Sequence, residues 1–154
     1  MSFKKNKYQV LRSAISKDLA AFCYKYLQIS AEADHWMLNN SVTHAGNLLI
    51  GNFNDPQVPN SYAKYADRVM ETLLVNTINT MQKKTGLKLV PTYSYTRLYR
   101  TGNILNRHKD RPSCEISTTL NLGGDPWPIY IDPTGANNVI HEYKGIIKPG
   151  APKG

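Results

Sequence analysis

Apolar residues recur at helical spacing after Ser16, which has the side chain of a helix N-cap. They follow one another at steps of three and four residues, the period of one helix face: Leu19, Phe22, Cys23, Tyr26 and Leu27. The pattern predicts a helix over residues 17–33, after a short extended piece at residues 8–11.

A second apolar stripe begins after Asn60, which we expect to be its N-cap. Its members are Tyr62, Tyr65, Ala66, Val69, Met70, Leu73, Ile78 and Met81. Gly86 follows Lys83 and Lys84 at the position of a left-handed C-cap. The stripe predicts a helix from residue 61 to about residue 84. Residues 39–59, rich in Asn and Gly, predict a loop.

Alternating polar and β-branched or aromatic residues become common after Pro91. This alternation is typical of strands, and it predicts four of them, at residues 92–100, 115–122, 127–131 and 139–143. Helices followed by short strands favour an α+β domain with a sandwich or barrel. We expect a single domain over residues 1–154, with helical support at 1–90 and a β-core at 91–154.

The chain has 154 residues and a formal net charge of +8. Most basic residues are scattered, but five crowd one segment: Arg97, Arg100, Arg107, Lys109 and Arg111. No nucleic-acid-binding motif accompanies them, so a pocket for a small anion is favoured over a nucleic-acid surface. The sequence also lacks a P-loop, a nucleophile elbow and a dinucleotide-binding fingerprint.

Cys23 and Cys114 lie far apart and belong to no zinc-binding pattern, so free thiols in a reducing compartment are expected. No apolar run approaches the roughly 20 residues of a membrane span, and the start of the chain lacks the apolar stretch of a secretion signal. These features predict a cytoplasmic protein without a membrane partner.

His108 and Asp110 are the candidates for metal ligation. On an extended backbone, side chains two residues apart share one face, so this pair can offer an imidazole nitrogen and a carboxylate oxygen to one ion. Such ligands with open coordination positions suit iron(II) in oxygenases. Because 4 histidines and 11 acidic residues produce about 0.3 such pairs by chance, the surrounding sequence must support the assignment.

That sequence combines Tyr99-x-x-Gly102 with His108-x-Asp110, then the run of residues 117–122 and Trp127-Pro128-Ile129-Tyr130. It resembles the prolyl-4-hydroxylase-like branch of the iron(II)/2-oxoglutarate dioxygenases, particularly its short bacterial and phage-type members. The helices and the Asn54-Asp55-Pro56 loop also resemble that group, so the resemblance covers most of the chain.

The resemblance implies a double-stranded β-helix, or jelly roll, with His108 and Asp110 as catalytic iron(II) ligands. It implies 2-oxoglutarate as a cosubstrate that chelates the metal and dioxygen as the oxidant. By position, Tyr99 corresponds to a tyrosine that meets a 2-oxoglutarate carboxylate, and Ser117 and Thr119 line the same pocket. Trp127 is expected either to cap this pocket or to join the core.

The pattern departs from that family after Asp110, where a distal histidine and a basic residue for the far carboxylate of 2-oxoglutarate are expected. His141 is the only later histidine, and residues 139–144 resemble a strand that leads into a turn rather than the ligand-bearing strand. Either the chain lacks the C-terminal part of a longer domain, which a further segment or a partner chain completes, or it has diverged. Truncation is favoured.

Two functions follow from these observations. The first is a dioxygenase that hydroxylates a prolyl or other peptide side chain, or a small molecule. The second is an inactive β-sandwich binding module whose basic surface serves an acidic protein or nucleic acid. Metal- and 2-oxoglutarate-dependent decarboxylation distinguishes them.

Overall fold

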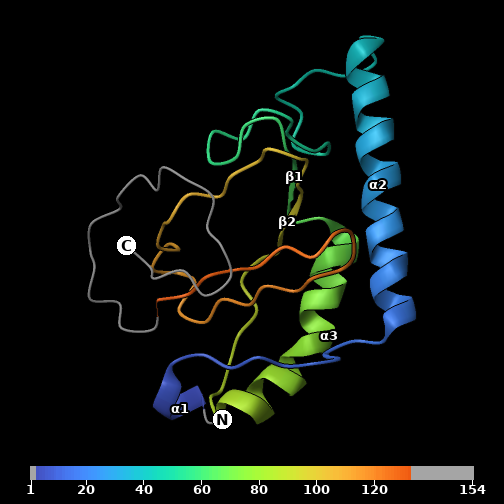
Figure 1. Ribbon diagram of the computed structural model, residues 1–154. Coiled ribbons are helices and arrows are strands. Elements are labelled where there is room, and N and C mark those ends of the chain that lie inside the picture. The colour runs from blue at the N-terminus through green and yellow to red at the C-terminus, as the bar shows by residue number, and fades with distance from the viewer. Residues whose placement is uncertain (1–2, 133–154) are drawn as a thin grey trace.

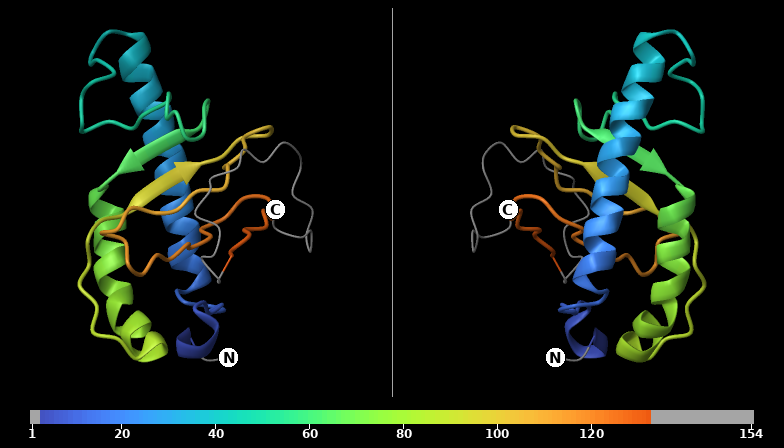
Figure 2. Two further views of the ribbon diagram at one scale, coloured as in Figure 1. Left: turned by 90° about the vertical axis from the view of Figure 1, so that its left-hand side faces the viewer. Right: turned by 90° about the vertical axis from the view of Figure 1, so that its right-hand side faces the viewer.

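The computed structural model describes residues 3–132. Its elements, in chain order, are α1 (Phe3–Asn6), α2 (Lys17–Asn39), β1 (Tyr62–Tyr65), α3 (Arg68–Thr85) and β2 (Tyr95–Leu98). Helices α2 and α3 lie side by side, and the sheet of β1 and β2 lies on one side of this pair (Figure 1, Figure 2). The segment after β2 crosses the same side without regular secondary structure.

Helix α2 begins as predicted, because the Ser16 side chain accepts a hydrogen bond of 3.1 Å from the Leu19 amide. It continues six residues beyond the predicted end and closes at Asn40, whose amide donates to the Trp36 carbonyl. The prediction was short because Asp34 interrupts the apolar stripe. In the structure this carboxylate is buried and hydrogen-bonded by residues outside the helix.

Helix α3 begins at Arg68, so the predicted start after Asn60 is wrong. Asp67 is the N-cap, and its carboxylate accepts from the amides of Val69 and Met70. Ala66, with a φ of 49°, separates the helix from β1. The spacing of the aromatic residues in β1 fits a helix as well as a strand, which explains the error. The Gly86 C-cap is confirmed, with a φ of 71°.

The strand predicted at residues 92–100 is present as β2, which pairs antiparallel with β1 in the register Tyr62↔Leu98. The predicted loop at 39–59 is confirmed and contributes only an isolated bridge, Asn52↔Ala63. Residues 115–122 and 127–131 form no strand, so those two predictions are wrong. Within residues 3–132 no strand pairs with either segment, and extended chain without a partner makes no ladder. Residues 139–143 lie outside the described range.

The core lies between the helices, where Cys23 and Leu27 of α2 pack with Met70 and Leu73 of α3. Leu98 of β2 and Leu122 of the following segment lie among the residues packed against this cluster. The described part of the chain is therefore mixed α+β, and the jelly roll remains a prediction. Across residues 3–132, no helix is both long enough and apolar enough to cross a membrane.

A network of buried polar groups joins α2, β1 and the start of α3. The Asp34 carboxylate accepts hydrogen bonds of 2.7 Å from the Gly51 amide and the Tyr62 hydroxyl. The Lys64 ammonium lies 3.9 Å from Asp34 and 3.4 Å from Asp67. Burial and the hydrogen bond to Asp34 raise the pKa of the Tyr62 phenol. The Tyr26 hydroxyl donates to the Asp67 carboxylate at 2.7 Å. We call this set of residues the Asp34–Asp67 network.

Candidate functional site

A tight turn after β2 sets the direction of the segment that carries His108. The Asn103 amide donates to the Arg100 carbonyl at 2.9 Å, and the Asn103 side chain accepts from the Arg100 amide. Gly102 has a φ of 88°, which a residue with a side chain rarely adopts. The Asn103 amide group also donates to the Pro59 carbonyl, so the turn is attached to the loop before β1.

His108 and Asp110 point toward each other, with Nε2 and Oδ1 at 3.5 Å. The His108 Nδ1 atom lies 2.9 Å from the Asn106 carbonyl. Since a carbonyl oxygen only accepts, Nδ1 is the donor in this contact, and Nε2 is the ring nitrogen that lies on the side of Asp110. Adjacent ligands of a metal with bonds of about 2.1 Å lie roughly 3 Å apart. The separation of the two atoms is thus close to that of neighbouring ligands on one ion.

The second carboxylate oxygen of Asp110 accepts a hydrogen bond from the Ser117 hydroxyl. This contact orients the carboxylate and leaves Oδ1 for another partner. The side chains of His108 and Asp110 are 32% and 47% exposed, so an ion can reach them from solvent. Among residues 3–132 no set of three His, Cys, Asp or Glu side chains converges on one point.

The chain beside this pair is held by Tyr93, whose hydroxyl lies 3.1 Å from the Cys114 sulfur. The hydrogen bond with Cys114, followed by burial, raises the pKa of Tyr93. The Arg111 guanidinium lies 5.4 Å from the centre of the Tyr93 ring, within the range of a cation–π contact. These contacts fix the turn that carries Ser117 back toward Asp110.

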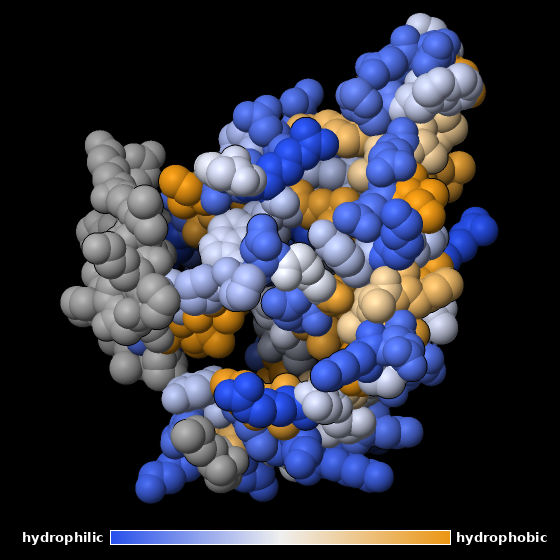
Figure 3. Space-filling model, turned by 45° about the vertical axis from the view of Figure 1, so that its right-hand side comes forward, coloured by the Kyte–Doolittle hydropathy of each residue, from blue (hydrophilic) through white to orange (hydrophobic). Residues whose placement is uncertain are grey.

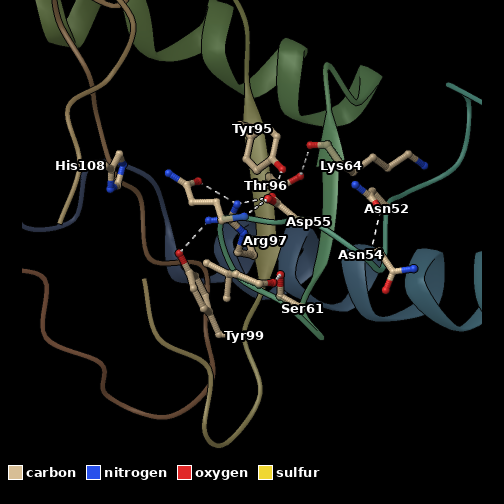
Figure 4. Close-up of polar contacts among 12 residues, drawn as sticks. Asn52, Asn54, Asp55, Ser61, Lys64, Tyr95, Thr96, Arg97, Tyr99 and His108 are labelled. Carbon is tan, nitrogen blue, oxygen red and sulfur yellow. Dashed lines mark hydrogen bonds and ion pairs between the residues drawn. The ribbon is translucent and has the colours of Figure 1, made fainter. Parts of the chain in front are cut away.

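Tyr99 belongs to a second cluster, which Figure 4 shows together with His108. Its hydroxyl accepts a hydrogen bond of 3.4 Å from the Arg97 guanidinium. The rings of Tyr99 and Trp127 meet edge to face, with centroids 4.0 Å apart. Trp127 is 45% exposed and thus lies outside the buried core.

The centre of the second cluster is Asp55, which the sequence marked only as part of a loop. Its carboxylate is buried and accepts from the Tyr95 hydroxyl and the Arg97 guanidinium. Burial alone would raise the pKa of Asp55, but the bonds from Tyr95 and Arg97 outweigh it and lower the pKa. Gln57 accepts from Arg97 at 3.1 Å, so the loop is joined to β2 by side chains.

A signal for this cluster was present in the strand pattern. Arg97 lies two residues after Tyr95 and two before Tyr99, so an extended chain from β2 to the residue after it directs all three to one side. The Arg97 side chain is only 7% exposed, and a buried cation in a strand requires a nearby carboxylate. The sequence does not say which carboxylate, because Asp55 lies 42 residues away.

The basic segment does not form one anion-binding surface in the structure. Arg97 is bound to Asp55, and Arg107 is bound to Asp132 at 2.7 Å. Arg111 lies over Tyr93. At least three of the five basic residues are therefore committed to partners within the chain.

The five predicted site residues thus fall into different surroundings. His108, Asp110 and Ser117 are brought together. Tyr99 lies in the Asp55 cluster, and Thr119 lies exposed on the segment after Ser117. His141 falls outside the described residues.

Comparison with known proteins adds no assignment: no family model matches the chain, and searches of curated proteins and of solved structures found no match.

Proposed function

We propose that the protein is an iron(II)- and 2-oxoglutarate-dependent dioxygenase that hydroxylates a prolyl or other peptide side chain, or a small molecule. The observation that carries the proposal is the approach of His108 Nε2 and Asp110 Oδ1 to 3.5 Å. In the neutral imidazole with its proton on Nδ1, both are acceptor atoms, and such a pair favours a shared cation between them. Their other polar atoms already have partners in Asn106 and Ser117.

The donor set favours an oxygenase metal over a closed structural site. One imidazole and one carboxylate leave several positions of a six-coordinate ion open, and iron(II) sites of this kind use open positions for cosubstrate and dioxygen. When bound, the metal supplies the redox chemistry that couples 2-oxoglutarate decarboxylation to hydroxylation. Ser117, by donating to Asp110, holds one metal ligand in position.

Tyr99 supports cosubstrate binding in this proposal. Its hydroxyl oxygen accepts from Arg97, so its own proton is available to donate to a carboxylate. Accepting a hydrogen bond from a cation strengthens that donation. The proposal assigns Thr119 no hydrogen bond to 2-oxoglutarate.

A reducing compartment, such as the cytoplasm, fits the same assignment. Cys23 and Cys114 are free thiols in the structure, and thiols persist where disulfides are reduced. An iron(II) site is also retained best under reducing conditions.

The test is succinate formation from 2-oxoglutarate with added iron(II), together with cobalt(II) titration followed by visible absorption. We expect both signals from the chain, or from the chain extended at its C-terminus where a further segment supplies the remaining ligands, and a loss of both in His108→Ala and Asp110→Ala. His44→Ala is the matched control, because it removes an exposed histidine from a loop. A folded protein without either signal would overturn the proposal, and binding of an acidic protein or nucleic acid would then favour the inactive module.

A further inference from the structure

One face of α2 carries a row of apolar side chains that are largely open to solvent, apart from Tyr26, which packs against the core and hydrogen-bonds Asp67. Going along the helix, their spacing alternates between three and four residues: Leu19, Phe22, Tyr26, Ile29, Ala33 and Trp36. We call these six residues the α2 seam. Four of them are 39% to 63% exposed, with Phe22 the highest. Figure 3 turns this side toward the viewer and shows hydrophobic side chains among hydrophilic ones along its right-hand part.

We propose that the α2 seam is the contact surface of an antiparallel homodimer, in which a second copy of this chain lays the same helix across it. Alternating steps of three and four residues over 18 positions are the signature of a helix that packs on another helix. A two-fold axis at the level midway between Leu27 and Gln28 places every residue of the α2 seam opposite another seam residue of the partner copy. Self-complementarity of this kind is what a two-fold interface requires.

The side chains that this axis places opposite one another are complementary in size. Phe22 meets Ala33 of the partner copy, so a phenyl ring lies against a methyl group. Tyr26 meets Ile29 of the partner copy, and Leu19 meets Trp36 of the partner copy. Each layer therefore combines one larger and one smaller side chain.

A groove at the N-terminal half of α2 provides a place for the last of these contacts. It has a volume of about 240 Å³ and is lined by Leu19, Phe22 and residues of α3 that include Val69 and Leu73. Trp36 lies 17 residues after Leu19 in the same helix, or roughly 25 Å away. The antiparallel arrangement thus places each Trp36, itself 59% exposed, at the groove of the other copy.

The charges that border the α2 seam favour the antiparallel direction. Lys25 and Glu32 are both exposed and both lie on the edge away from the core. In the antiparallel pair this edge of one helix faces the same edge of the other. The dimer therefore contains two equivalent contacts, each between Lys25 of one copy and Glu32 of the other. In a parallel pair the residues opposite them would be Ser30 and Met37, which carry no charge.

The size of the surface predicts a weak dimer. Large apolar side chains carry on the order of 200 Å² each, so the two seams together bury on the order of 1,000 Å², about the lower limit for a specific interface. We therefore expect association to depend on concentration, as mass action requires.

Sedimentation equilibrium of the full chain tests the proposal. We expect the mass to rise with concentration from 17.4 kDa toward twice that value. Lys25→Glu and Glu32→Lys should each raise the dissociation constant about tenfold, because attraction becomes repulsion at two places. The double variant should restore the native value, and Lys88→Glu, the same charge change on an exposed residue outside α2, should leave it unchanged.

Cross-linking fixes the direction of the helices. In a chain carrying Phe22→Cys and Ala33→Cys, the two new thiols lie roughly 16 Å apart along one helix and cannot join within a copy. Peptide mass spectrometry should find position 22 joined to position 33 of another copy. A link from 22 to 22, a monomer at every concentration, or a dimer that ignores both charge reversals would overturn the proposal.

Discussion

Carboxylates occur in two contrasting surroundings in this molecule. In the Asp34–Asp67 network they are buried and meet hydroxyl, amide and ammonium donors. At the His108–Asp110 pair one carboxylate oxygen faces an imidazole nitrogen across 3.5 Å, and both side chains are partly open to solvent. The first arrangement is complete without a ligand, whereas the second sets two atoms that can each ligate a metal side by side at the surface. Buried groups with full sets of partners hold a fold together, and exposed ligand atoms this close mark a place where an ion fits.

The largest expected effect comes from breaking the complete network. Asp34→Ala leaves the Tyr62 hydroxyl and the Gly51 amide buried without their acceptor, at a cost of about 3 kcal/mol in the free energy of unfolding. Urea denaturation measures the change. Asp125→Ala, which removes an exposed carboxylate, is the control and should change little. Equal stability of the two variants would show that the network is not structural.

Asp55 is an intermediate case between the two surroundings. Its carboxylate is buried, but its partner Arg97 also bonds Tyr99, which the proposed function assigns to cosubstrate binding. Asp55→Asn removes the negative partner of the Arg97 guanidinium, and we expect a loss of about 2 kcal/mol. The folded pKa of Asp55 is lowered, so its stabilisation is complete above the unfolded value of about 3.9 and disappears as pH falls through the folded value. The variant should therefore lose less stability in acid than the native chain, and parallel pH profiles would contradict this account.

Ser117 lies at the exposed pair, where a smaller effect is expected. Ser117→Ala removes the hydrogen bond that orients Asp110, and it should weaken cobalt(II) binding about tenfold, as loss of an outer hydrogen bond does in metal sites. Ser113→Ala, an exposed serine in the same segment, should bind as the native chain does. If both variants bind equally well, Ser117 does not position the ligand.

The sequence predicted those parts of the molecule that depend on neighbouring residues. The predictions of Ser16 as an N-cap and Gly86 as a C-cap were correct, because a cap acts within one helical turn. The short distance between His108 and Asp110 requires only an extended backbone between them. The start of α3 was misjudged, because the aromatic residues of β1, Tyr62 and Tyr65, have a spacing that also fits a helix. The contacts of Lys64 with Asp34 and Asp67, which belong to the strand, are visible only in the folded chain. Asp55 was missed because its partners are 40 and 42 residues distant, and only the folded chain brings them together.

The smallest expected effect completes the contrast between the two surroundings. His108→Ala and Asp110→Ala should each change the free energy of unfolding by less than about 0.5 kcal/mol, since partly exposed side chains away from the core contribute little to stability. The same urea titrations used for Asp34→Ala measure this. Each variant should keep the native thermal transition without metal but lose the stabilisation that iron(II) confers on the native chain, because a ligand stabilises only the state that binds it. A large loss of stability in the metal-free protein would place the pair with the structural network instead.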